Sequence, residues 1–208
     1  MRSIIKKKTR TGKSPLYFAK RHKSFEKRNS MILEGLPKPG SWILDVGSNT
    51  GETSNDMADA GHVAIGLEKM APERKIALEG SRGLSGFLCT DVTGDFILGG
   101  VDWDAILLLS VLHRVFAFEG EDQMKSVLSA CGQKTKKLFI EGSTRHARYN
   151  DQGQASPSFT DLDVESAKAW HSDLFKEVLG ESWSVRKDVA LECSKNEPFR
   201  LFYELERA

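Results

Sequence analysis

The strongest constraint on the fold is an alternation of short apolar runs with segments of helical pattern. A helical pattern follows the first run through Met57 and Ala60, and a second one, over about 122–130, separates the last two runs. Strands that alternate with helices predict an α/β fold with a doubly wound, mostly parallel sheet that binds ligands at the carboxyl ends of its strands. The runs with the length and composition of buried strands are 42–46, 62–67, 86–90, 104–109 and 137–141.

Both ends of the chain depart from this alternation. At the C-terminal end, a helix is predicted over 163–179, and two extended runs at 183–191 and 199–205 predict an antiparallel hairpin. Near the N-terminus, 14–38 indicates an interrupted helix that ends at Pro37 and Pro39. We therefore predict a flexible basic arm at 1–13 and a single domain over 14–208, in which 14–38 forms an N-terminal helical lid.

Charge is concentrated at the N-terminus. Residues 1–30 contain 11 Lys and Arg against one acid, Glu26, whereas the remainder contains 19 basic and 28 acidic residues. A basic arm of this kind suits an anionic partner, such as RNA, a phosphorylated glycan or a membrane face. The alternatives are a solvated N-terminal segment or a cleaved transit peptide.

The composition argues against several classes of protein. Cys89, Cys131 and Cys193 lie far apart and form no ligand spacing with histidine, so neither a disulfide framework nor a metal site is expected. No apolar run approaches the roughly 20 residues that cross a bilayer, so no membrane span is expected. A reducing, cytoplasmic location suits this composition.

The first predicted strand runs into a glycine-containing loop with a distinct chemistry. Gly47 and Gly51 allow a tight turn and a close approach of a ligand. The start of the next helix offers free amide groups to a carboxylate, and Asp45 can attract an ammonium group. Asn49 is among the few residues that tolerate positive φ. The spacing matches neither the dinucleotide nor the phosphate-binding glycine motif, which argues against NAD and ATP.

The string Asp45-Val46-Gly47-Ser48-Asn49-Thr50-Gly51 resembles the first signature of class I S-adenosylmethionine methyltransferases, with Asn49 in place of the middle glycine. The resemblance covers about residues 40–206. It implies a Rossmann-like methyltransferase fold, for which five parallel strands and a terminal hairpin are typical, and S-adenosylmethionine as cofactor.

The resemblance also implies the residues that contact the cofactor. Glu68 is expected to hold the ribose hydroxyls, and Asp91, at the end of the third predicted strand, the adenine amino group. Either acid could instead be a solvated strand end. The expected cofactor-binding set is Asp45, Gly47, Ser48, Asn49, Gly51, Glu68, Asp91, Val92 and Ser110.

Two segments are candidates for the acceptor site. Ser110-Val111-Leu112-His113-Arg114 resembles text that is found in small-molecule and phosphate methyltransferases, and His113 is a candidate substrate contact or general base. After the fifth predicted strand, a polar loop at 141–149 carries Arg145 and Arg148, whose guanidinium groups suit phosphate or carboxylate. It faintly resembles enzymes that methylate a terminal phosphate on bacterial polysaccharides. The alternatives are a packed histidine and a solvated loop.

The helix that precedes the first strand is a candidate lid. Tyr17, Arg21, His22 and Arg28 could close over the site, or the helix could be purely structural. The function predicted from the sequence is S-adenosylmethionine-dependent methylation of an oxygen on an anionic or phosphorylated acceptor. The alternatives are an RNA methyltransferase that uses residues 1–30 and a non-catalytic module that binds the cofactor or a partner.

Overall fold

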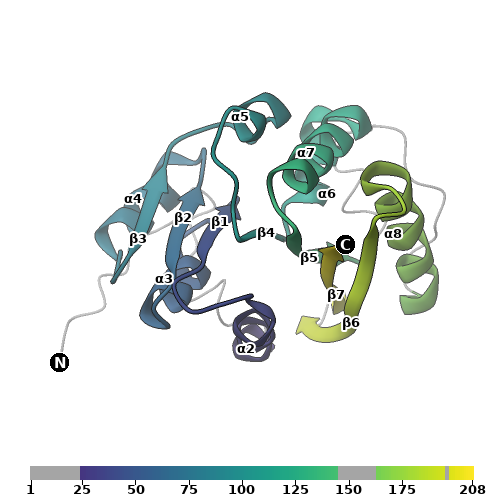
Figure 1. Ribbon diagram of the computed structural model, residues 1–208, viewed down its shortest axis with the longest axis horizontal. Helices are drawn as coiled ribbons and strands as arrows, with labels where there is room; N and C mark the ends of the chain where they lie inside the picture. Colours follow the sequence, from purple (N-terminus) through teal and green to yellow (C-terminus); the bar gives the residue numbers. More distant parts are fainter. Residues whose placement is uncertain (1–23, 145–162, 195–196) are drawn as a thin grey trace.

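A computed structural model describes residues 24–144, 163–194 and 197–208. Its centre is a seven-stranded sheet in the order β3-β2-β1-β4-β5-β7-β6 (Figure 1). The first five strands are parallel, and β7 runs antiparallel between β5 and β6. The predicted α/β fold with a C-terminal hairpin is thus confirmed. The strands are β1 Trp42–Val46, β2 Val63–Leu67, β3 Ser85–Leu88, β4 Ala105–Leu109, β5 Lys137–Ser143, β6 Trp183–Ser194 and β7 Glu197–Arg207.

Helices cover both faces of the sheet because successive strand residues point to opposite sides. In β1, Leu44 and Val46 join one apolar core with residues of α5, α6, α7 and α8, whereas Ile43 joins a second core with residues of α2 and α3. Asp45 therefore lies on the face that carries α2 and α3. The helices are α2 Phe25–Gly35, α3 Glu52–Asp59, α4 Ala71–Glu79, α5 Gly94–Leu98, α6 Leu112–Glu119, α7 Glu121–Lys134 and α8 Val164–Leu179.

The strand order reverses between β1 and β4. Strand β1 pairs with β2 on one side and with β4 on the other, so the chain reverses its direction of progress across the sheet at this point. In open α/β sheets, ligands bind outside the carboxyl ends of the strands at such a reversal. The loop after Val46 begins at this edge.

Several predicted strand ends differ from the structure, and two of them bear on the site. The third strand ends at Leu88 rather than at residue 90, because its last pairing is with Leu67, where β2 itself ends. The fifth strand continues to Ser143, because β7 pairs with it as far as Arg200. Residues 141–143 are therefore buried strand and not loop, and a helix, α6, begins at Leu112 where only a strand end was expected.

No helix in the part of the chain that the structure describes is long and apolar enough to cross a membrane.

Candidate functional site

The loop after β1 is built from left-handed residues. Gly47, Asn49 and Gly51 have φ values of 74°, 53° and 80°. Asn49 thus adopts the positive φ that asparagine tolerates, and its side-chain oxygen accepts the Thr50 amide at 2.9 Å. Such short-range bonding is one reason why asparagine replaces glycine at left-handed positions.

The two glycines are required by the protein's own packing. A Cβ on Gly47 would lie 2.9 Å from Val111, just beyond β4, and a Cβ on Gly51 would lie 2.5 Å from the ring of Phe87 in β3. The loop therefore packs closely against β3 and against the segment that follows β4. The sequence analysis assigns these glycines to a tight turn and to the close approach of a ligand. The packing of Val111 and Phe87 against them is a further, sufficient reason.

Ser48 points to the sheet. Its amide donates to Leu67 O at 2.9 Å, and its hydroxyl would lie 2.5 Å from a Cβ on Gly66 in β2. The side chain thus fills a space behind the loop that Gly66 leaves open.

Asp45, near the carboxyl end of β1, is a buried carboxylate. It accepts a hydrogen bond of 2.6 Å from Ser54 Oγ on α3. Burial raises its pKa to about 6, against the opposing effects of the Ser54 hydrogen bond and the positive charge of Arg28. Near neutral pH, Asp45 is a carboxylate held in a weakly solvated position, where an added cation would interact strongly with it.

Glu68 follows β2 and supports the loop from the other side. Its two oxygens accept the amides of Asn49 at 3.0 Å and of Met70 at 2.7 Å. Burial raises its pKa, and these two hydrogen bonds oppose that shift. A carboxylate has about four lone-pair sites, so Glu68 can hold these amides and still accept two hydroxyl groups.

Asp91 lies beyond the end of β3 and is exposed. Its carboxylate is 3.2 Å from Lys69 Nζ, which also lies 3.4 Å from Glu119 at the end of α6. The neighbouring Val92 packs against the core. One oxygen of the Asp91 carboxylate is therefore paired with Lys69, and the side chain is otherwise exposed to solvent.

The end of β4 meets a buried polar chain. Ser110, with φ of 60°, donates through its hydroxyl to Glu141 on β5 and accepts from Arg200 on β7 at 2.9 Å. Glu141 also forms an ion pair of 2.9 Å with Arg28 on α2. The sequence analysis missed Arg200 and placed Glu141 at the junction of the fifth predicted strand and the polar loop. The available signal was the alternation in β5, which puts Lys137, Phe139 and Glu141 on one face.

The predicted acceptor residues are only partly described. His113 is buried in the first turn of α6, two residues after the Gly47–Val111 contact. Arg145 and Arg148 lie outside the described residues, as do Tyr17, Arg21 and His22 of the predicted lid. The structure does describe the later part of the predicted lid, the helix α2, which contains Arg28.

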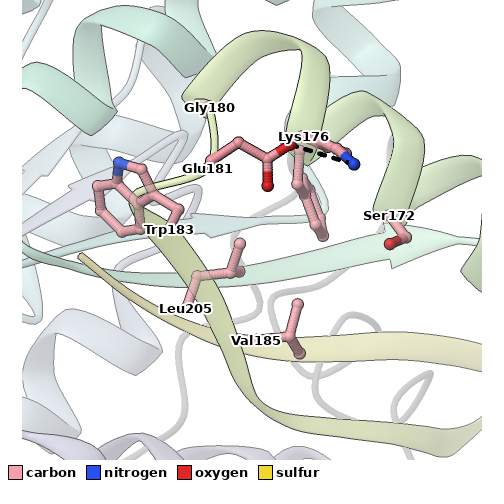
Figure 2. Close-up of a pocket in the computed structure, with 8 residues that line it drawn as sticks. Ser172, Lys176, Gly180, Glu181, Trp183, Val185 and Leu205 are labelled. Atoms are coloured by element: carbon pink, nitrogen blue, oxygen red, sulfur yellow. Dashed lines mark ion pairs between the residues drawn. The ribbon is translucent and has the colours of Figure 1, made fainter. Parts of the chain in front are cut away.

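A cavity of about 220 Å³ lies elsewhere, between α8 and the hairpin of β6 and β7. Figure 2 shows Trp183 and Leu205 among its lining residues, together with the Lys176–Glu181 ion pair. Its lining residues come from a different part of the sheet than β1, β2 and β4. It is separate from the loop, Asp45 and Glu68.

Within residues 24–144, 163–194 and 197–208, no group of three His, Cys, Asp or Glu side chains could hold a metal ion.

Comparisons with solved structures point to one fold. The chain superposes on magnesium protoporphyrin IX methyltransferase from Synechocystis PCC 6803 with bound S-adenosylmethionine at a TM-score of 0.62, with 14% identity over 88% of this chain and 79% of that one. For the N-methyltransferase NodS from Bradyrhizobium japonicum WM9 with S-adenosylhomocysteine, the TM-score is 0.64, with 15% identity over 89% and 88%.

The bifunctional kinase-methyltransferase WbdD gives a TM-score of 0.59, with 15% identity over 88% of this chain and 38% of that chain. No family model and no curated protein matches the sequence. At these identities the likeness shows the fold alone, and the fold is the Rossmann-like architecture of these methyltransferases.

Proposed function

We propose that this chain, whose fold is that of S-adenosylmethionine-dependent methyltransferases, binds S-adenosylmethionine beyond β1, β2 and β4 and transfers its methyl group to an acceptor. One observation carries the proposal: the buried carboxylate of Asp45 stands beside a left-handed loop that Glu68 braces, at the reversal of strand order. A buried acid with perturbed pKa at a topological switch point is typical of a ligand site.

The residues of the site fit the parts of this cofactor. Asp45 would hold the ammonium group, and the amides at the start of α3 would hold the carboxylate. Glu68 would accept the ribose hydroxyls, and Asp91 with Val92 would bind the adenine. The cofactor supplies an electrophilic methyl group when bound, and the protein's part is to orient that group toward the acceptor and exclude water.

For the acceptor, we propose an oxygen on an anionic or phosphorylated molecule. The support is the arginine content of the segment that follows β5, where Arg145 and Arg148 would bind the anion, and the position of His113 just after the end of β4. His113 would orient the acceptor or take its proton.

Calorimetry with S-adenosylmethionine and S-adenosylhomocysteine tests the cofactor site. We expect affinity at the micromolar scale or better for both, and none for NAD or ATP. Glu68→Ala should weaken binding by roughly 1–3 kcal/mol through lost charge-assisted hydrogen bonds. Glu177→Ala on α8, a surface glutamate paired with Lys125, is the control and should bind normally. The absence of heat with S-adenosylmethionine would refute the proposal.

Lys69→Met should increase the affinity for S-adenosylmethionine by about two- to fivefold. The Lys69–Asp91 pair is exposed, so breaking it costs little, yet it occupies the carboxylate that the adenine amino group needs. Lys125→Met on α7, which also removes a bridging lysine, should leave the affinity unchanged. A decrease with Lys69→Met would mean that the lysine itself contacts the cofactor.

Two alternatives remain in view, and one assay separates them from the main proposal. The 11 basic residues among the first 30 favour an RNA acceptor as the second candidate. Incubation with methyl-labelled S-adenosylmethionine and fractionated lysate should label a small-molecule or glycan fraction. Label that is lost after ribonuclease treatment would support the RNA methyltransferase, and cofactor binding without any label would support a non-catalytic module.

A further inference from the structure

A continuous polar chain crosses the carboxyl ends of the strands on the face that carries α2 and α3. At its centre, Arg28 Nη1 lies 2.9 Å from Glu141 on β5, and its Nη2 donates to Thr53 Oγ1 on α3 at 2.8 Å. Both Arg28 and Glu141 are buried. The guanidinium group of Arg28 thus joins α3, the helix after the glycine loop, to the carboxyl end of β5.

This network of polar side chains connects two parts of the proposed site, the region of Asp45 and the region beyond β4. Next to Thr53, Ser54 donates to Asp45 at 2.6 Å. On the other side, Glu141 accepts from Ser110, whose left-handed backbone leads to Val111 and its contact with Gly47. A single side chain from α2 therefore contacts both α3, whose Ser54 donates to Asp45, and β5, whose Glu141 accepts from Ser110.

We propose that Arg28 is a positioning residue for the S-adenosylmethionine site. Its side chain fixes the position of α3 relative to β5, and its positive charge favours the ionised form of Asp45. The inference rests on the proposed function for its ligand. It assigns to α2 a role in cofactor binding that is separate from that of a lid.

The charges around Asp45 explain why this role is needed. Glu52 on α3 and Glu68 after β2 both disfavour its ionised form, as does burial, whereas Ser54 and Arg28 favour it. An ammonium ligand is bound by the ionised carboxylate and not by the neutral acid. Removal of the Arg28 charge should therefore make cofactor binding fail at a higher pH than in the wild type.

The test is the dissociation constant of S-adenosylhomocysteine between pH 5 and 8, measured by calorimetry. For Arg28→Gln, the pH below which affinity falls should shift upward by about one unit or more. Arg28→Lys keeps the positive charge but not the guanidinium fork, so it should return that pH close to the wild-type value. The ligand's own amino group titrates equally against every variant, so the ratio to the wild type isolates the protein. Arg82→Gln is the control, because Arg82 pairs with Asp56 and Asp59 on the exposed side of α3.

The double variant Arg28→Gln/Glu141→Gln covers the case in which the single variant unfolds, since it leaves no uncompensated buried charge. It should show a smaller upward shift than Arg28→Gln, because the opposing Glu141 charge is removed together with that of Arg28. A wild-type pH profile in folded Arg28→Gln, or in the double variant where the single variant unfolds, would overturn the proposal and leave the proposed function standing.

A second measurement does not depend on the ligand. Carbon-13 titration of the Asp45 carboxyl in the cofactor-free protein should show a higher pKa in Arg28→Gln than in the wild type. An unchanged value would overturn the charge role of Arg28. If the wild type bound no S-adenosylhomocysteine, the proposed function would fail, and this titration would still decide whether Arg28 acts on Asp45.

Discussion

Asp45→Asn is expected to stabilise the folded protein at pH 7 by up to about 3 kcal/mol and to weaken S-adenosylmethionine binding at least about tenfold. Burial raises the pKa of Asp45 from 3.8 to about 6, so the ionised side chain is less favourable in the folded than in the unfolded protein. Asparagine keeps the hydrogen bond from Ser54 and removes the buried charge. The same charge is what the ammonium group of the cofactor would bind.

The stability difference between Asp45→Asn and the wild type should depend on pH. A raised carboxyl pKa favours the folded state below pH 3.8 and loses this effect as the pH rises through 6. Denaturant unfolding should therefore show little difference between Asp45→Asn and wild type near pH 3.5 and a growing advantage for the variant up to pH 7. Asp102→Asn, at an exposed acid, is the control. A variant that is less stable than the wild type at pH 7 would contradict the prediction.

Acid is expected to destabilise the protein through His171 by up to about 3 kcal/mol. His171 is fully enclosed on α8, with Tyr203 Oη 3.2 Å from its Nδ1 and Gly142 of β5 against its ring. Burial lowers its pKa from 6.5 to about 4. A lowered histidine pKa leaves stability intact above pH 6.5 and removes it as the pH falls toward 4, because the unfolded chain takes up the proton first.

His171→Gln should lose stability at pH 8 through poorer packing, but that deficit should shrink as the pH falls through the window from 6.5 to 4. The measurement is the free energy of unfolding of both proteins at several pH values. Parallel curves across the window would show that His171 does not carry this pH dependence. Over the same window the Asp45 effect has the opposite sign, so the wild type should vary less with pH than either variant alone.

The parts of the site that follow from local chemistry were predictable. A glycine-containing loop after a buried strand, with asparagine at a left-handed position, follows from backbone sterics that involve only neighbouring residues. The acids Asp45 and Glu68 could be placed because strand ends are visible as apolar runs. Asp91 was placed less well, because the end of β3 depends on where its neighbour β2 stops pairing.

The sequence by itself determined the α/β class, the terminal hairpin and the loop at Gly47, because these depend on periodicity and on conformations accessible to single residues. Only the tertiary structure decided which charges meet. Arg28 and Glu141 are 113 positions apart, and Ser110 and Arg200 are 90 apart. They come together because β7 inserts beside β5 and because α2 packs on the same face of the sheet. The Lys69 contact with Asp91 and the burial that raises the pKa of Asp45 have the same origin, since desolvation is produced by residues from many elements at once.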